Sequence, residues 1–190
     1  STHALNTVLE EKGSRAGLLT TLGFRDVYEI GRQWKGDEVF NIFYPGGKRF
    51  IPRHRVAEIS ERVDKSGKAL VPLDLGAVDE AIAALMEHNI DALAISFLFS
   101  YVNPVHEQLA AERIRSRYPD LFVTLSSEVN PVWREYERTA TTVLNAYLGP
   151  RMERYFSGME EAVLRHFPRA HPFLMKSNGG IGAPRAMAKF

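Results

Sequence analysis

The sequence predicts an α/β fold with a mixed, partly parallel sheet and flanking helices. Two continuous apolar runs, 92–99 (ALAISFLF) and 121–125 (LFVTL), have the character of strands that are buried on both faces. A helical pattern over 104–118 lies between them, and another over 75–88 precedes them. Strands that alternate with helices in this way are typical of right-handed crossovers between parallel strands.

The part of the chain before these runs predicts a smaller α/β segment. We predict the elements of this segment from three features of its sequence. Apolar spacing indicates the helices and strands, turn residues indicate the turns, and the proline at position 72 indicates an edge strand. In order, we expect a helix at 2–12, a strand at 15–20, a helix at 23–30, a long aromatic loop at 31–47, a half-buried strand at 56–63, a turn at 64–67 and an edge strand at 70–73.

A soft boundary near residues 72–76 separates two segments, 1–73 and 74–190, which we expect to form one compact unit. Beyond residue 125 the pattern predicts a long helix over about 133–166 that breaks near Gly149 and Pro150. A last strand at 171–175 is expected to lead into the SNGG loop.

Composition excludes several classes of protein. Lys plus Arg minus Asp plus Glu is 24 − 23 = +1, which gives no field that would attract nucleic acid. Cysteine is absent, so disulfides and thiolate metal sites are excluded, and a reducing cytoplasm is compatible. No apolar stretch is long enough to span a membrane. The six histidines have no metal-ligand spacing, and we expect no metal to be held by this chain.

Residues 126–147 (SSEVNPVWREYERTATTVLNAY) carry the most informative pattern. As a helix, this segment separates an apolar side from a polar side. The apolar side holds Tyr136, Ala140, Val143, Leu144 and Tyr147. The polar row holds Arg134, Arg138, Thr142 and Asn145, with Glu135 and Thr139 beside it. This row is either a solvated face with one or two Arg–Glu pairs or a surface that grips a carboxylate or phosphate.

The same segment resembles a signature of the hydantoinase A/5-oxoprolinase family. Three other stretches also resemble family motifs: TTLGFRDVYEIGRQ at 20–33, FLFSYVNPVHE at 97–107 and SNGG at 177–180. The four stretches occur in the expected order over nearly the whole chain. The resemblance implies part of an actin-like ATPase fold, and an enzyme in which ATP activates a carbonyl oxygen before water opens a cyclic amide.

The resemblance leaves alternatives open. Family members also include acetone and acetophenone carboxylases, in which the activated partners are a ketone enolate and bicarbonate. The chain departs from the usual pattern at Trp133, which leaves the substrate open. A third alternative is a non-catalytic interaction domain, for which the aromatic residues Trp34, Phe40, Phe43 and Tyr44 would suit a contact.

The matched motif and the helix geometry together give a set of candidate site residues. We expect Arg134, Arg138 and Glu135 to be catalytic, with the arginines offsetting the transferred charge. We expect Thr139, Thr142, Asn145 and Arg32 to contact the substrate. Ser177, Asn178, Gly179 and Gly180 are expected to contact the nucleotide.

The resemblance also implies partners outside this chain. Residues 1–13 resemble a family segment that follows a Gly-rich phosphate loop, so we expect an internal part of a larger subunit. ATP and Mg²⁺ would serve the complete enzyme and are not expected to be bound by this chain alone. The expected partners are a cyclic amide or ketone and a second large subunit or fused half, with no nucleic acid and no membrane.

Four local features also have a simpler interpretation. SNGG is either a turn or a ligand loop, and Asn103 is expected to cap the following helix. Residues 23–33 form either a salt-bridged turn or one wall of the substrate site. His106 is expected at the surface or in a cap.

Overall fold

A four-stranded parallel sheet lies at the centre of the computed structural model, which describes residues 2–32, 40–43, 49–175 and 179–184. The strand order is β2-β1-β5-β6, so strands from both predicted segments join one sheet. The elements are α1 (Thr2–Leu9), β1 (Ala16–Thr21), α2 (Val27–Ile30), η2 (Arg53–Arg55), β2 (Val56–Ile59), β3 (Arg62–Val63), β4 (Ala69–Val71), α3 (Leu75–Met86), β5 (Ala92–Ser96), α4 (Val105–Arg117), β6 (Phe122–Leu125), α5 (Ser126–Val129), α6 (Glu135–His166), β7 (Leu174–Met175) and β8 (Ile181–Gly182).

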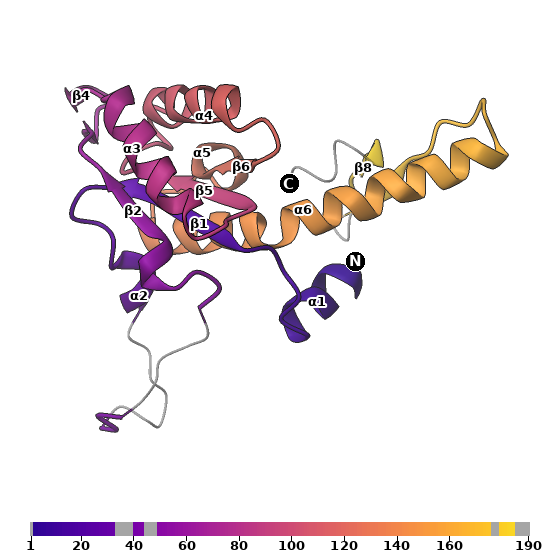
Figure 1. Ribbon diagram of the computed structural model, residues 1–190, viewed down its shortest axis with the longest axis horizontal. Coiled ribbons are helices and arrows are strands. Elements are labelled where there is room, and N and C mark those ends of the chain that lie inside the picture. Colours follow the sequence, from indigo (N-terminus) through magenta and orange to yellow (C-terminus); the bar gives the residue numbers. More distant parts are fainter. Residues whose placement is uncertain (1, 33–39, 44–48, 176–178, 185–190) are drawn as a thin grey trace.

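Helices cover both faces of this sheet (Figure 1). Helices α3 and α4 pack on one face against Leu93 and Ile95 of β5, and α6 packs on the other face against Ala92 and Ala94. Successive side chains of a strand point to opposite faces. The small residues of β5 therefore face α6, and the larger ones fill the core under α3 and α4.

The predicted α/β fold with its parallel crossovers is confirmed, but two strands were wrongly predicted. Residues 56–63 do not form one strand, because the chain leaves β2 after Ile59 and pairs β3 with β4 in a separate antiparallel hairpin. The last strand does not enter the parallel sheet. β7 is two residues long, ends at the exposed Met175 and pairs only with β8, so it lacks the buried apolar run that a central strand needs.

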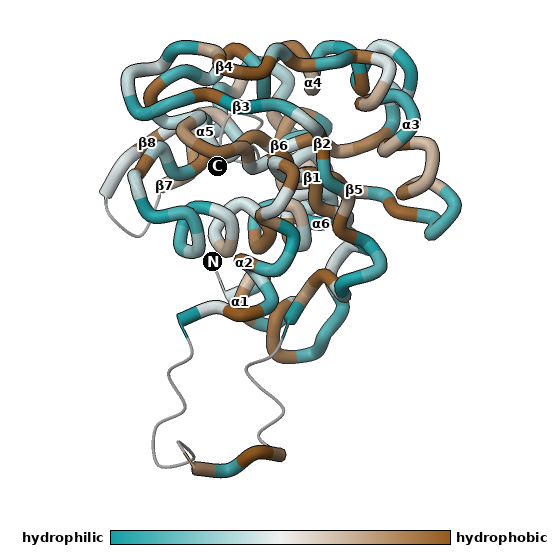
Figure 2. Tube along the Cα trace, turned by 90° about the vertical axis from the view of Figure 1, so that its left-hand side faces the viewer, coloured by the Kyte–Doolittle hydropathy of each residue, from teal (hydrophilic) through white to brown (hydrophobic). Residues whose placement is uncertain are grey.

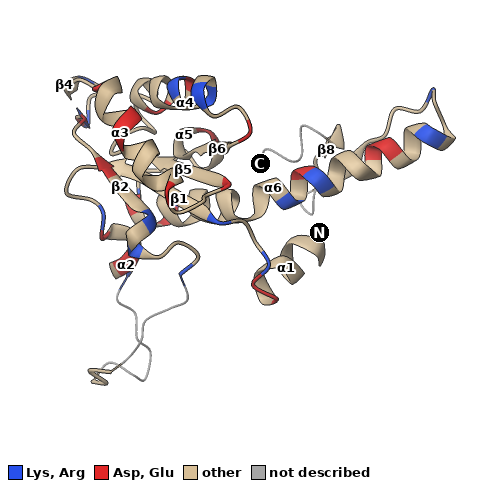
Figure 3. Cartoon of the chain, viewed as in Figure 1, with Lys and Arg blue, Asp and Glu red and all other residues tan. Residues whose placement is uncertain are grey.

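Helix α6 runs unbroken for 32 residues, so the predicted break at Gly149 and Pro150 is wrong. Both residues are buried against the sheet, and this packing holds the helix through the proline. After Met152 the helix leaves the body of the molecule, as Figure 1 shows. Charges of both signs occur along its outer half, whereas the arginines of α4 gather toward the C-terminal end of that helix (Figure 3). None of the helices in the described ranges combines the length and apolar content needed to cross a bilayer.

Two glycines of α6 are expected to respond in opposite ways to alanine. A Cβ on Gly149 would lie 2.2 Å from Cζ of Phe122, whereas one on Gly158 would meet nothing within 4 Å. We expect Gly149→Ala to lower the free energy of unfolding by about 1–3 kcal/mol through overpacking. Gly158→Ala should raise it by about 0.5–1 kcal/mol through helix propensity. Urea unfolding measures both, and equal effects would contradict the close approach of α6 to β6.

Candidate functional site

A buried polar layer lies at the carboxyl ends of the parallel strands. Thr20 and Ser96 have the same parity as the residues of β1 and β5 that face α6. Thr139 of α6 meets them there: its Oγ1 lies 2.8 Å from Ser96 Oγ, and Thr20 Oγ1 donates to the Ser96 carbonyl at 3.0 Å. Ligands of open α/β sheets bind at this edge.

Arg138 is the central side chain of this layer and is only 1% exposed. Its Nη1 donates to Ser100 Oγ at 3.1 Å, and its Nη2 donates to the Phe97 carbonyl at 2.9 Å. Its Cζ lies 5.3 Å from the centre of the Tyr101 ring. Its Nε is buried and has no hydrogen-bond partner in the described part of the chain. Ser100 and Phe97 belong to the turn after β5, so this turn fixes the guanidinium.

The charge of Arg138 is balanced at a distance. Burial lowers the pKa of the Arg138 guanidinium, and the negative charges of Glu107 and Glu135 oppose that shift. Glu107 is fully buried, and its Oε1 accepts from Phe97 N at 2.9 Å and from Ser126 Oγ at 2.6 Å. Ser126 Oγ in turn lies 3.0 Å from Ser100 Oγ. A chain of two serines therefore connects the carboxylate to the guanidinium.

An open depression lies beside the start of α6. Its lining residues are Phe24, Val27, Arg32, Trp133, Arg134, Glu135, Tyr136 and Glu137. A small hole, lined by Thr20, Phe24, Val27, Ser96, Leu98, Glu135, Arg138 and Thr139, shares Phe24, Val27 and Glu135 with it. The depression and the buried Arg138 are therefore parts of one site.

The structure brings together five of the seven predicted catalytic and substrate residues: Arg134, Arg138, Glu135, Thr139 and Arg32. Arg32 pairs with Glu137 across the depression. Thr142 and Asn145 do not line it. Thr142 Oγ1 donates to the Arg138 carbonyl at 2.7 Å, and Asn145 Nδ2 donates to Thr124 Oγ1 at 2.9 Å.

The interpretation of the polar row as a solvated face is wrong. Arg138 and Thr142 are buried, while Tyr136 and Leu144 of the predicted apolar side are only half-buried. The reason is that the fold supplies hydrogen-bond partners for this face: Arg138 donates to Ser100 Oγ and to the Phe97 carbonyl, and Thr142 donates to the Arg138 carbonyl. Only Arg134, at the start of the row, is exposed.

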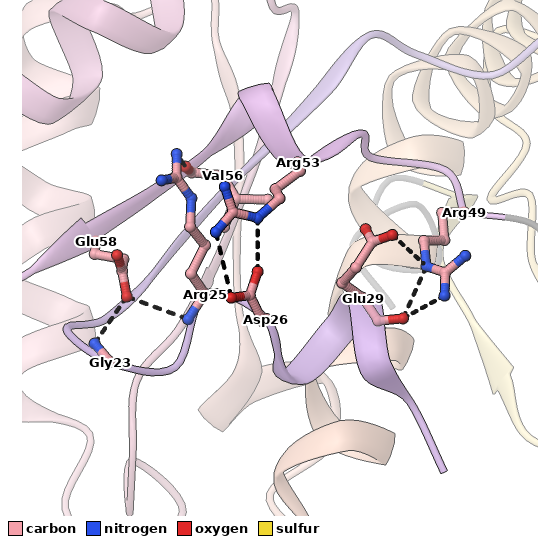
Figure 4. A network of polar contacts seen from close by, with 8 residues as sticks. All are labelled: Gly23, Arg25, Asp26, Glu29, Arg49, Arg53, Val56 and Glu58. Carbon is pink, nitrogen blue, oxygen red and sulfur yellow. Dashed lines mark hydrogen bonds and ion pairs between the residues drawn. The ribbon is translucent and has the colours of Figure 1, made fainter. Parts of the chain in front are cut away.

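Residues 23–32 form a salt-bridged turn and also one wall of the depression. Figure 4 shows Asp26 pointing to Arg53 and Glu29 pointing to Arg49. Hydrogen bonding from Arg53 lowers the pKa of Asp26. Glu58 Oε1 accepts from the Gly23 amide at 2.7 Å (Figure 4). These contacts hold the turn in place. Other residues of the same segment line the depression, namely Phe24, Val27 and Arg32.

The SNGG loop lies only partly in the described ranges, since Ser177 and Asn178 fall outside them. Gly179 and Gly180 are exposed, and Gly179 has a positive φ of 87°. They lie between β7 and β8, which pair with each other and do not join the parallel sheet. The expected buried strand before this loop is absent from the described residues.

Sequence reasoning missed a second buried polar cluster. Glu61 Oε2 lies 2.7 Å from His106 Nδ1, and Glu61 Oε1 accepts from Thr21 Oγ1. The prediction that His106 is a surface or capping residue is wrong, because its side chain is buried. The signal was present: His106 and Glu107 precede the buried Ala110 and Ala111 by one helical turn and so share their face. The expected cap is made by Asn103, whose Oδ1 accepts from Val105 N at 3.1 Å.

Within the described ranges, His, Asp and Glu side chains do not come together in groups of three or more that could hold a metal ion. The side chains that line the depression and the hole offer hydrogen-bonding groups and charges of both signs. The guanidinium groups of Arg32, Arg134 and Arg138 suit the binding of an oxyanion or a polarised carbonyl oxygen.

Comparison with known proteins shows which family the chain resembles. A family model described as the hydantoinase/oxoprolinase N-terminal region matches residues 1–118, and the hydantoinase/oxoprolinase model matches residues 138–190. The chain is 40% identical over 183 residues to caprolactamase subunit alpha of Pseudomonas jessenii, which covers 95% of this chain and 26% of that protein. It is 37% identical over 199 residues to the acetophenone carboxylase gamma subunit of Aromatoleum aromaticum, covering 96% and 26%.

Solved structures show the same relationship. The ATP-dependent caprolactamase from Pseudomonas jessenii superposes with a TM-score of 0.85 at 39% identity, covering 97% of this chain and 27% of that one. The nucleotide-free structure of acetone carboxylase gives a TM-score of 0.84 at 25% identity, covering 98% and 28%. The chain thus spans about a quarter of the length of these relatives. With its motifs, its fold and both family models in agreement, the chain belongs to the hydantoinase/oxoprolinase family.

Proposed function

We propose that this chain is part of an ATP-dependent enzyme that opens a cyclic amide after phosphoryl activation of its carbonyl oxygen. Its relatives include proteins named caprolactamase and 5-oxoprolinase, and caprolactam and 5-oxoproline are both cyclic amides. Within the complete protein, this chain would supply one wall of the substrate site and the cationic groups next to it.

The buried guanidinium of Arg138 is the observation that carries this proposal. It lies where the parallel strands end, makes no ion pair in the described part of the chain and keeps one N–H without a partner. A preorganised cation in a site with little water stabilises developing negative charge far better than one in solvent. Arg138 would offset the charge that forms on the activated oxygen, with Arg134 as the second, exposed donor.

The other predicted residues have distinct roles in this proposal. Glu135 and Thr139 line the hole beside Arg138 and would orient the substrate. Arg32 forms an ion pair with Glu137, and this pair would bound the depression on one side. Thr142 hydrogen-bonds to the preceding turn of α6, and Asn145 hydrogen-bonds to Thr124 of β6. The two residues would therefore fix the position of α6 on the sheet.

ATP would supply the phosphoryl group, together with Mg²⁺. Arginine side chains at the depression fit an anionic group, and the described residues contain no cluster of carboxylates for the metal. We propose that the phosphate loops come from other parts of a longer subunit with an actin-like fold, and that Ser177, Asn178, Gly179 and Gly180 add one loop. A cysteine-free chain suits a cytoplasmic enzyme.

A partner subunit is part of the same proposal. Several relatives are named as subunits of caprolactamase, acetophenone carboxylase and acetone carboxylase. The tip of the loop after α2 exposes Phe40, Ile42 and Phe43 at 95%, 85% and 85%. Figure 2 shows this apolar tip at a distance from the body of the molecule. Such a tip suits burial in another subunit, and a purely structural role remains the alternative of another class.

ATP hydrolysis by the complete natural subunit, assayed with its partner, tests the proposed activity. We expect stimulation by hydantoin or 5-oxoproline without added bicarbonate. Stimulation by acetone only in the presence of bicarbonate would move the protein to ketone carboxylation, which the acetone carboxylase structure keeps as the second candidate. No stimulation by any of these compounds would favour the interaction domain.

A further inference from the structure

The depression beside α6 is walled by aromatic rings. Phe24, Trp133 and Tyr136 line it from two different elements, the turn after β1 and the segment around the start of α6. Trp133 is 67% exposed, although tryptophan is the largest apolar side chain. The guanidinium Cζ of Arg134 lies 5.0 Å from the centre of its ring. An exposed indole on the wall of a depression offers a flat surface for stacking.

These walls are held in place by the fold. The Tyr136 ring packs on Gly31, where a Cβ would lie 3.4 Å from the ring, and Gly31 has a positive φ of 59°. The Arg32–Glu137 pair joins the same two elements. On the opposite wall, the Arg62 guanidinium lies 5.1 Å from the centre of the Phe24 ring. The depression is thus preorganised rather than formed by a free loop.

The lining of the depression includes one charged donor, Arg134, and one charged acceptor, Glu135. The Arg134 guanidinium lies over the Trp133 ring and its charge acts on Glu137, while the charge of Glu135 acts on Arg138. An amide in a small ring is held cis, so its N–H and C=O lie on the same edge. Glu135 can accept from that N–H while Arg134 donates to that carbonyl oxygen.

We propose that Trp133 is the specificity-determining residue of this site and selects flat, cis-amide rings by stacking. This inference rests on the proposed cyclic amide chemistry and adds where the ring lies. The ring stacks on the indole, its amide edge faces Arg134 and Glu135, and its carbonyl side points toward Arg138. An acyclic amide is trans and presents its N–H and C=O on opposite edges, so it cannot use both groups.

Binding can be measured without turnover, because the indole of Trp133 reports on its surroundings by fluorescence. In the complete subunit, the difference between the parent and a Trp133→Phe variant isolates the signal of this indole. We expect hydantoin and 5-oxoproline to change this fluorescence in a saturable way, and N-methylacetamide to leave it unchanged. Equal changes with the acyclic amide, or none with either ring, would overturn the inference.

Turnover by the complete enzyme provides the second measurement. Trp133→Ala should raise KM for the cyclic amide about tenfold or more while kcat changes little, since stacking is lost before the chemical step. Trp133→Phe should restore most of the affinity. Phe167→Ala is the matched control, because Phe167 is also 67% exposed but lies at the far end of α6, and its KM should stay at the parent value.

The outcomes separate this inference from the proposed function. Turnover of a cyclic amide with an unchanged KM in Trp133→Ala would overturn the role of Trp133 and leave the proposed function in place. Turnover of ketones alone, with no fluorescence response to either ring, would overturn both. A KM effect in Trp133→Ala that phenylalanine rescues, together with a ring-specific fluorescence change, supports both.

Discussion

Replacing Arg138 with methionine is expected to remove most of the turnover of the complete enzyme while the fold remains nearly as stable as before. Arg138 is almost completely buried and its guanidinium contacts no carboxylate in the described part of the chain, so burial of its charge is costly. Methionine has a similar length and needs no hydrogen bonds. We expect the free energy of unfolding to change by less than about 2 kcal/mol, since the lost hydrogen bonds and the relieved charge oppose each other.

The effect on turnover should be much larger. Loss of one preorganised donor next to developing negative charge typically lowers kcat about 100-fold or more. Urea unfolding and ATP-coupled turnover on the same preparation measure the two effects. Arg154→Met, at an exposed position further along α6, is the control and should alter neither. Parallel losses of stability and turnover in Arg138→Met would show that Arg138 is structural, and unchanged turnover would remove it from the proposed site.

The parallel sheet could be predicted because its signal is local. Residues 92–99 and 121–125 are continuous apolar runs, and only a strand covered on both faces needs such a run. The break between β2 and β3 falls at Ser60, Glu61 and Arg62, three consecutive polar residues that interrupt the apolar–polar alternation. The sequence alone does not show that the chain turns there, because the partners of the buried Glu61 carboxylate, Thr21 and His106, are far away in sequence.

The position of Arg138 shows a second limit of sequence reasoning. Arginine is almost never fully buried without a paired charge, so a polar row on a helix predicts a solvated face. Its partners, the Phe97 carbonyl and Ser100, come from the turn after β5 and are not visible in the helix itself. The family resemblance and the helix pattern singled out Arg138 as a candidate, but its burial is a property of the fold.

The continuity of α6 through Pro150 has a similar origin. Proline removes one backbone hydrogen bond and strains the preceding turn, which predicts a break. In the folded chain the same turn is buried, and Gly149 lies so close to the Phe122 ring that a larger residue would not fit. Tertiary packing therefore offsets the tendency of Pro150 to break the helix.

Replacing Glu107 with glutamine is expected to cause the largest loss of stability. The carboxylate accepts from two backbone amides, Phe97 N at 2.9 Å and Ser127 N at 2.9 Å, and from two hydroxyls, Ser126 Oγ and Ser127 Oγ, each at 2.6 Å. An amide group has one accepting oxygen, so one backbone N–H must face the NH2 group and lose its acceptor. Hydroxyls can rotate to accept, but a backbone N–H cannot.

We therefore expect Glu107→Gln to lower the free energy of unfolding by about 2–4 kcal/mol, which is the cost of burying an unsatisfied donor and losing charge-assisted bonds. Glu112→Gln, on the exposed side of the same helix, should stay within about 0.5 kcal/mol of the parent. Urea unfolding measures both variants. Because Glu107 joins the ends of β5 and β6 and reaches Arg138 through Ser126 and Ser100, its loss should also displace the guanidinium. An equally small effect in the two variants would show that this carboxylate does not set the geometry of the strand ends, and the positioning of Arg138 would then come from its direct contacts with Phe97, Ser100 and Tyr101.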